Sequence, residues 1–273
     1  MIENDRLARA YERGLRHEKS GRADLAEKAY RECLALDPAD HGGVSVRLAA
    51  LGRADVPERA PAAYVETLFD QHAEVFDDIL VEQLGYCVPL MVRAGLDRVG
   101  AGPFARMLDL GCGTGLAGGA LRDRCDHISG VDLAEQMVAV ADERDVYDDL
   151  YVGDAIAFVQ DWDEAPFDLV TATDMLPYLG ALEALMSAVS AVLVEGGLFV
   201  FSTETLPDTA FGDLDYVVGR HHRFHHRLGY VESTALAAGF TLLGDEEIVV
   251  RHDEGEPQPG HLVMIRKGAG PLR

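Results

Sequence analysis

The spacing of apolar residues along the chain changes near residue 100. Before residue 36, apolar residues recur every three or four positions, which predicts two helices joined by a turn at residues 20–22. Pro38 ends the second helix, and a weaker helical pattern covers residues 44–51. Residues 53–63 contain two prolines and few large apolar residues, which predicts a connector. We therefore expect a helical region at residues 1–55 and a larger domain at residues 60–273.

Within the larger domain, short helices are predicted first, at residues 64–70, 72–84 and 86–94. From residue 104 onward, short apolar runs alternate with helical patterns. The runs at residues 107–110, 128–132, 150–152, 169–172 and 198–201 predict strands of a parallel sheet that is covered on both faces. Two last runs, at residues 240–250 and 261–266, have no helix between them and predict an antiparallel pair. The expected fold is a doubly wound, Rossmann-like α/β domain with a seven-stranded sheet whose last strand is antiparallel.

Composition narrows the range of partners. The chain has 273 residues and carries 47 acidic against 24 basic residues, a net charge of −23, which repels a phosphate backbone and argues against nucleic acid as a partner. Its four cysteines lack the paired spacing of a zinc site or a disulfide framework. No apolar run approaches membrane-spanning length, and the first residues do not read as a secretory signal. We expect a soluble, cytoplasmic protein that has no membrane partner.

Candidate chemistry begins directly after the first predicted strand of the sheet. There the sequence reads Asp109-Leu110-Gly111-Cys112-Gly113-Thr114-Gly115, an acidic residue followed by a glycine turn and a helix start. Glycines at such a turn let a ligand lie directly against the main chain. This segment resembles the first motif of the class I S-adenosylmethionine-dependent methyltransferases. The order of an N-terminal tetratricopeptide-like unit, residues 64–70 and this core resembles the bacterial methyltransferases that carry such repeats. Asp109 could bind the ammonium group of the cofactor, directly or through water. It could also simply cap the helix.

Further segments match the same family in order. Asp132 ends the second strand about 20 residues after the glycines, where a carboxylate can accept both ribose hydroxyls. Asp154 ends the third strand, where the family reads the adenine edge, and residues 167–174 and 195–197 match later motifs. The resemblance covers residues 64–270. It implies S-adenosylmethionine as cofactor, S-adenosylhomocysteine as product, and these cofactor-binding residues: Asp109, Gly111, Cys112, Gly113, Gly115, Asp132, Leu133, Met137, Asp154, Ala155 and Thr173.

Parts of the sequence also fit functions other than small-molecule methyl transfer. Residues 113–118 formally fit the GxGxxG pattern of nicotinamide enzymes, but Asp109 and Gly111 precede it and Asp154 adds a third-strand contact, which favours the methyltransferase. A non-catalytic protein that binds S-adenosylmethionine or S-adenosylhomocysteine is an alternative, as is a protein methyltransferase. We expect the methyl acceptor to be a small molecule with an oxygen nucleophile. This acceptor could be an anion.

Acceptor-site candidates cluster after the fifth strand, where residues 220–227 form a basic, histidine-rich patch. One interpretation is a salt-bridged helix face. A second is a metal site at two His pairs spaced i, i+4, for which no further ligands are evident, so that no metal is predicted. A third is an anionic acceptor held by Arg223, with Tyr178 as a second substrate-binding residue. The candidate catalytic groups are Asp174, His72, His222 and His225; His72 belongs to a segment that lies over the cofactor in related families.

The N-terminal region has its own resemblance. Gly14, Ala26, Tyr30 and Pro38 have the spacing of a single tetratricopeptide repeat. Such a unit could bind a protein partner, mediate self-association or shield the main domain, and a single repeat offers too little groove to favour partner binding.

Overall fold

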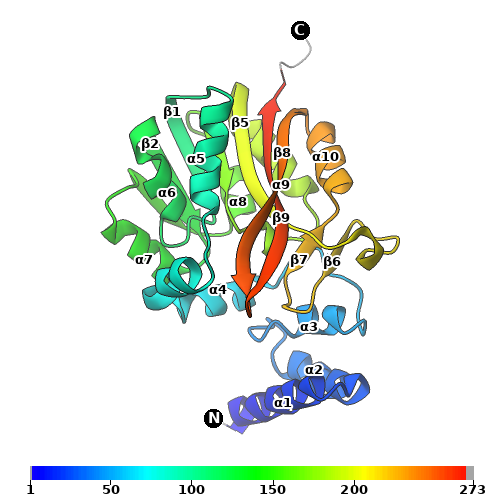
Figure 1. Ribbon diagram of the computed structural model, residues 1–273. Helices are drawn as coiled ribbons and strands as arrows, with labels where there is room; N and C mark the ends of the chain where they lie inside the picture. Colours follow the sequence, from blue (N-terminus) through cyan, green and yellow to red (C-terminus); the bar gives the residue numbers. More distant parts are fainter. Residues whose placement is uncertain (1, 269–273) are drawn as a thin grey trace.

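The computed structural model describes residues 2–268, and a seven-stranded sheet lies between layers of helices (Figure 1). The spatial order of its strands is β3-β2-β1-β4-β5-β9-β8. Their bounds are β1 (Phe104–Leu110), β2 (Cys125–Asp132), β3 (Asp149–Val152), β4 (Phe167–Ala172), β5 (Leu193–Glu204), β8 (Phe240–Asp253) and β9 (Glu256–Lys267). The first five are parallel, and β9 is antiparallel to β5 and β8. The predicted Rossmann-like fold with an antiparallel last strand is therefore confirmed.

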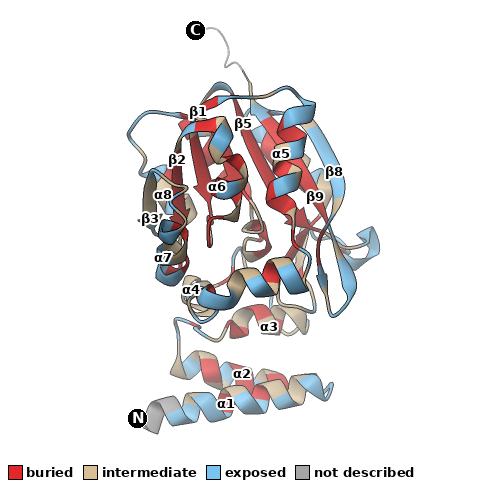
Figure 2. Cartoon of the chain, turned by 60° about the vertical axis from the view of Figure 1, so that its left-hand side comes forward, coloured by how far each residue is buried: buried red, intermediate tan, exposed pale blue. Residues whose placement is uncertain are grey.

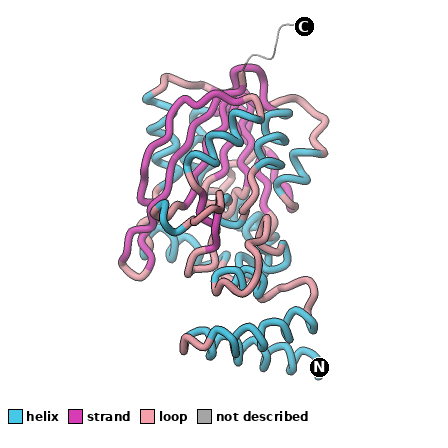
Figure 3. The backbone as a smooth tube through the Cα atoms, turned by 90° about the vertical axis from the view of Figure 1, so that its right-hand side faces the viewer, coloured by secondary structure: helices cyan, strands magenta, loops and turns pink. Residues whose placement is uncertain are grey.

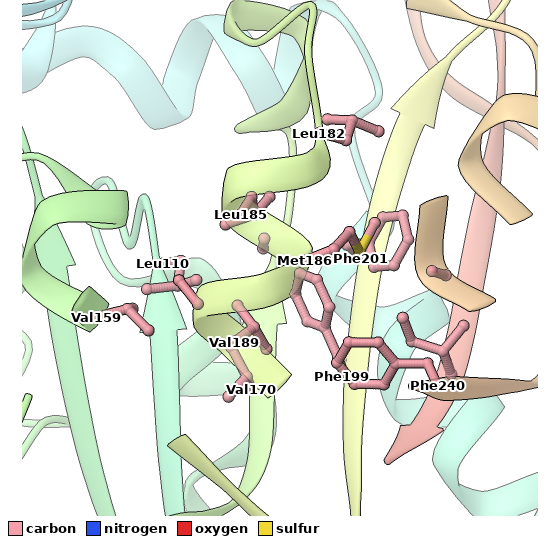
Figure 4. Packing of buried hydrophobic residues seen from close by; sticks show 14 of the residues in the cluster. Leu110, Val159, Val170, Leu182, Leu185, Met186, Val189, Phe199, Phe201 and Phe240 are labelled. Atoms are coloured by element: carbon pink, nitrogen blue, oxygen red, sulfur yellow. The ribbon is translucent and has the colours of Figure 1, made fainter. Parts of the chain in front are cut away.

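Two apolar cores sandwich the sheet because successive strand residues point to opposite faces. Met107 and Leu198 belong to one core with α5 (Val88–Arg98) and α6 (Leu116–Leu121). Leu108 and Phe199 belong to the other core, together with α8 (Ala155–Gln160), α9 (Glu183–Val192) and α10 (Leu228–Ala237). Figure 2 shows that the central strands are the most completely buried elements, and Figure 4 shows the side chains of α9 packed over those of β5. Helix α7 (Glu135–Glu143) packs beside β2 and β3.

The hairpin at the C-terminal edge of the sheet is longer than its predicted runs. The two strands continue to a two-residue turn at Glu254 and Gly255, which both have positive φ, as the tight turns of β-hairpins require. Pro257 and Pro259 lie within β9 rather than in a loop. They are tolerated because β9 pairs with β5 only from Gly260 onward, so the earlier residues of β9 have a ladder on one side only.

The N-terminal helices form a separate small layer. Helices α1 (Ile2–Lys19), α2 (Ala23–Leu36) and α3 (Val44–Ala50) lie beyond the end of the sheet where the parallel strands finish (Figures 1 and 3). The α1–α2 pair packs closely because Gly14 faces the buried ring of Tyr30. The predicted two-helix arrangement is therefore present, while its identity as a tetratricopeptide repeat stays a prediction.

The connector between the N-terminal helices and the main domain is hydrogen-bonded to the main domain. Ala60 donates its backbone N–H to the carbonyl of Tyr178 at 2.9 Å, and Gly180 donates to the carbonyl of Glu58 at 2.7 Å. Residues 55–60 are therefore not a free linker, because these hydrogen bonds hold the segment along the carboxyl edge of the sheet. Among the described residues, no helix combines the length and apolar character needed to cross a membrane.

Replacing Gly14 with Ala should destabilise the N-terminal layer. A Cβ there would stand 2.2 Å from Cε1 of Tyr30, whose ring is fully buried and cannot move aside. Overpacking of this kind costs about 1–3 kcal/mol, more than the gain in helix propensity. Denaturant unfolding should show the loss. Gly119→Ala in α6 is the matched control, because nothing lies within 4 Å of its Cβ position, and equal behaviour of the two variants would contradict the packing argument.

Candidate active site

One large pocket opens at the carboxyl ends of β1, β2 and β4, where the strand order reverses between β1 and β4. Ligands of doubly wound sheets bind at this switch point. The empty volume of the pocket is about 1030 Å³ with its open mouth and adjoining solvent included. Its wall contains ten of the residues predicted from the sequence: Gly111, Cys112, Gly113, Asp132, Leu133, Asp154, Ala155, Thr173, Asp174 and Tyr178.

The glycine turn after β1 has the form that a bound cofactor requires. Gly113 has a φ of +53°, and a Cβ at this position would meet no atom within 4 Å. The chain therefore leaves open space against its own backbone inside the pocket. The Gly113 N–H donates to Oδ2 of Asp132 at 2.8 Å, which ties the turn to the end of β2. By contrast, Gly115 packs against Tyr147 and is not part of the wall.

Asp132 is the buried acid of this half of the pocket. Its second oxygen, Oδ1, accepts from the Ala134 N–H at 2.9 Å, so two backbone donors fix the carboxylate at the wall. Burial raises the pKa of Asp132, and the hydrogen bonds from the backbone oppose that rise. A carboxylate that lines a pocket beside an open glycine turn fits the ribose and the chain of an S-adenosyl group. The residues present therefore fit the cofactor that the motifs imply.

Asp109 lies behind the wall rather than in it. Its side chain is fully buried and accepts hydrogen bonds at 2.7 Å from the hydroxyls of Thr171 and Tyr147. Burial raises the pKa of Asp109 to about 6, although both hydroxyls work in the opposite direction. Direct contact with a ligand ammonium is not part of this arrangement. Asp109 instead joins β1, β4 and the segment before β3 beneath the glycine turn.

Two other predicted cofactor residues have structural roles as well. Asp154 caps α8 by accepting from the Ala157 N–H at 3.0 Å, and its other oxygen accepts from Arg59 at 2.9 Å across the pocket mouth. Its contact with an adenine amine stays a prediction. Met137 is fully buried in a cluster with Ala73 and Ala134 and does not reach the pocket.

The segment before β1 closes one side of the pocket. Helix α4 (Ala62–Asp70) is followed by a 3₁₀ turn (Ala73–Val75) and a π-helical turn (Asp78–Gln83), and Phe69 and Phe76 of this segment line the wall. Asp77 holds the segment in place, because it accepts from Thr114 at 2.6 Å and pairs with Arg144. His72 does not line the pocket; its Nδ1 bonds the Leu68 carbonyl.

The opposite end of the pocket is polar and rests on a buried charge cluster. Oδ1 of Asp174 accepts from Arg223 at 2.6 Å and lies 3.5 Å from a nitrogen of Arg251. The same two arginines donate to Oε1 of Glu204, at 2.7 and 2.6 Å. We call Asp174, Glu204, Arg223 and Arg251 the charge quartet. Burial raises the pKa of Glu204, but the two guanidinium groups outweigh it and lower the pKa overall, so the quartet carries no net charge.

Asp174 of the quartet and the neighbouring Tyr178 present polar groups to the pocket. Asp174 has a φ of +59°, and Oδ2 makes none of the side-chain hydrogen bonds found among the described residues. The Tyr178 hydroxyl accepts from Arg223 at 2.9 Å, which leaves its own hydrogen free to donate. Burial raises the pKa of Tyr178 to about 12, so the phenol stays protonated.

The histidine-rich patch is a hairpin rather than a helix. Strands β6 (Tyr216–Val218) and β7 (Phe224–His226) pair antiparallel, which removes the i, i+4 spacing on which a helical metal site would rest. Arg223 pairs with Asp174 and Glu204 behind Tyr178 and does not line the pocket. Its charge is therefore neutralised by these two carboxylates and is not offered to an anion. His225 is buried beside Glu204, and burial lowers the pKa of His225. His222 points to α1, far from the pocket wall.

Asp174 is thus the only one of the four predicted catalytic residues in the wall. Sequence reasoning missed Glu204, Arg251 and Tyr86, a buried tyrosine that lines the polar end. Arg251 carried one weak signal, because it is a charged residue next to the apolar run of β8. In the part of the chain that the structure describes, no three His, Cys, Asp or Glu side chains are arranged to hold a metal ion.

The sheet order, the glycine turn after β1 and the acid after β2 together define a class I methyltransferase domain. Comparison with known proteins agrees, because residues 108–201 match the family model described as a methyltransferase domain. Residues 108–201 are therefore a methyltransferase domain, and the fold and motifs of the chain support the predicted class I S-adenosylmethionine-dependent type.

Individual relatives cover only part of this chain. A ubiquinone biosynthesis O-methyltransferase from Idiomarina loihiensis is 37% identical over 101 residues, which are 36% of this chain and 42% of that protein. The chain thus matches about two fifths of the length of that curated relative. An S-adenosylmethionine-dependent methyltransferase from Clostridium acetobutylicum shares the fold, with a TM-score of 0.52, 17% identity, and coverage of 74% of this chain and 100% of that one. A chain from the complex of the Haloferax volcanii Trm112 methyltransferase activator with a putative methyltransferase has a TM-score of 0.57 and 17% identity, covering 77% and 100%.

Asp132→Asn should weaken the binding of S-adenosylhomocysteine. Loss of charge-assisted hydrogen bonds to a ribose costs about 1.5–3 kcal/mol, or roughly 10- to 150-fold in the dissociation constant. Isothermal titration calorimetry measures it directly. Asp126→Asn, at the exposed start of the same strand, is the control. Unchanged affinity in Asp132→Asn would remove Asp132 from the binding site.

Asp109→Asn should change how stability depends on pH. The pKa of Asp109 is about 6 in the folded chain and near the ordinary value of 3.8 when unfolded. The folded state therefore binds the proton more tightly, and the stability that Asp109 contributes falls as pH rises from about 4 to about 6. Asparagine does not titrate. The unfolding free energy of the variant, relative to the original chain, should rise by up to about 3 kcal/mol between pH 4 and pH 7. A difference that is constant with pH would contradict this account.

Proposed function

We propose that the protein transfers a methyl group from S-adenosylmethionine to the hydroxyl group of a small, largely apolar molecule. The observation that carries this proposal is the pairing, at one pocket, of a cofactor half with a separate polar end at Asp174 and Tyr178. The apolar side chains between them, among them Phe69, Phe76 and Leu80, suit the body of an uncharged acceptor. The matched segment of the Idiomarina O-methyltransferase agrees with oxygen as the nucleophile.

The polar end favours a neutral hydroxyl over an anion. Both arginines of the charge quartet are neutralised by Glu204 and Asp174, so the group that reaches the pocket is a carboxylate oxygen. An anionic acceptor would be repelled by Oδ2 of Asp174. A hydroxyl can donate its hydrogen to that oxygen and accept one from Tyr178, which satisfies both wall groups.

The residues of the chain then have separate tasks. Asp132 and the turn at Gly113 would hold S-adenosylmethionine, which supplies an electrophilic methyl group when bound. Oδ2 of Asp174 orients the acceptor hydroxyl and takes its proton, while Arg223 and Arg251 keep the other oxygen of Asp174 fixed. The segment at residues 62–83 excludes water from the pocket. Methyl transfer needs alignment more than strong base catalysis, which matches a carboxylate held by two guanidinium groups.

Three naphthalene compounds that differ in their polar group test the acceptor class. With protein saturated with S-adenosylhomocysteine, 2-naphthol should bind at least about tenfold more tightly than 2-naphthoate, because only the anion opposes Asp174. The cationic 2-naphthylmethylamine distinguishes a preference for hydroxyls from simple attraction to the carboxylate. Calorimetry gives the affinities, and mass spectrometry detects transfer of a deuterated methyl group to the bound compound.

Asp174→Asn should lower kcat/KM for 2-naphthol by about 10- to 100-fold, the cost of a lost charged hydrogen bond, and leave S-adenosylhomocysteine affinity unchanged. Asp208→Asn is the control, since that side chain is exposed and lies between β5 and β6, outside the pocket. Tighter binding of the carboxylate than of the alcohol would overturn the acceptor class. Binding of both S-adenosylmethionine and 2-naphthol without any methyl transfer would favour the non-catalytic alternative.

A further inference from the structure

The hairpin that carries Arg223 is held from two sides. Arg223 reaches the charge quartet, whereas its neighbour His222 points the opposite way, toward the N-terminal helices. Nε2 of His222 lies 3.0 Å from Oε1 of Glu18, near the end of α1. The chain between these two contacts is a single peptide unit. The Glu18 contact of His222 is therefore adjacent in the chain to the arginine that pairs with Asp174.

Glu18 is the centre of a compact ionic cluster. It accepts from Arg47 of α3 at 3.2 Å and from the hydroxyl of Tyr30 of α2, so one carboxylate joins all three N-terminal helices to the hairpin. Its side chain and that of His222 are only 18% and 16% exposed. Burial alone would raise the pKa of Glu18, but His222, Tyr30 and Arg47 lower it to about 2, so Glu18 is ionised in the folded protein.

The hairpin turn has little freedom to compensate for a lost contact. His222 has a φ of +61°, an uncommon conformation for a residue with a side chain. The turn is closed by the Gly219 N–H, which donates to the Arg223 carbonyl at 2.9 Å, and Val218 and Phe224 on either side pack against Val46 of α3. The N-terminal helices thus contact the turn through both charge and apolar packing.

We propose that the N-terminal helical region is a positioning element of the acceptor site. Glu18 and His222 are positioning residues, which act through Arg223 to hold Asp174 and Tyr178 at the polar end of the pocket. This role rests on the proposed function for its consequence in catalysis, but the mechanical coupling itself does not. It also differs from shielding, because it predicts an effect at Asp174 and not merely on the stability of the chain.

Hydrogen exchange of the full-length chain tests the coupling without any acceptor. Glu18→Gln removes the charge, and His222→Asn removes the imidazole while keeping a residue that tolerates positive φ. In both variants the amides of residues 216–226 and 174–179 should exchange about tenfold faster, as expected for the loss of one partly buried charged hydrogen bond. Glu32→Gln is the matched control, because its pairing with Arg13 is exposed and remote from the hairpin.

Two exchange patterns would overturn the proposal. Faster exchange confined to residues 5–55 would mean that the helices rest on the hairpin without holding it. Faster exchange that includes α9 and the central strands to the same degree would mean a general role in stability. Acceleration limited to the hairpin and to residues 174–179 supports the coupling.

Binding measurements test whether the coupling affects the acceptor site. Both variants should bind 2-naphthol about tenfold more weakly than the original chain, with the same affinity for S-adenosylhomocysteine. If the original chain binds S-adenosylhomocysteine but not 2-naphthol, the proposed acceptor is wrong, while the exchange data still decide the coupling. Equal 2-naphthol affinity in the original chain and both variants would overturn the positioning role.

Discussion

The charge quartet is the interaction on which the acceptor half of this protein depends. Asp174 follows β4, Glu204 ends β5, Arg251 belongs to β8, and Arg223 comes from the hairpin inserted after β5. Four segments that are distant in sequence meet there, with one oxygen of each carboxylate facing both guanidinium groups. Removing one member would leave a buried charge without its partner, a change that costs about 3–5 kcal/mol in other proteins. The quartet therefore ties the edge hairpin and the insertion to the centre of the sheet.

The cofactor half is built on a different principle. Its key groups lie on adjacent parallel strands, and parallel strands bring their carboxyl ends to one edge of a sheet. Asp132 meets the glycine turn there, because its carboxylate accepts from the backbone N–H groups of Gly113 and Ala134. Asp109 supports them from below, where it is buried and joined to two hydroxyl groups. The groups at the proposed cofactor end thus follow neighbouring strands, whereas those at the proposed acceptor end come from remote segments.

The N-terminal helices connect these observations to the architecture of the whole chain. They lie at the carboxyl edge, beside the insertion rather than beside the cofactor turn (Figure 1). Their connector forms part of the pocket mouth, since Arg59 reaches Asp154 across it. A region that could be taken as an independent appendage is therefore placed where it touches both the acceptor wall and the entrance.

The sequence alone was enough to predict the fold class and many of the residues that line the pocket. Period-two and period-3.6 patterns are local, and the glycine turn with Asp132 is a short, ordered set of residues, so both can be recognised without a structure. The acceptor wall could not be predicted in this way. Arg223 looked like an anion-binding residue and His222 like a catalytic base, because residue type says nothing about which carboxylate will face each side chain. Only the tertiary structure pairs Arg223 with Asp174 and Glu204, turns His222 toward Glu18, and brings Arg251 from β8 to the same place. Pairing over such sequence distances is decided by the packing of whole elements, and no local pattern records it.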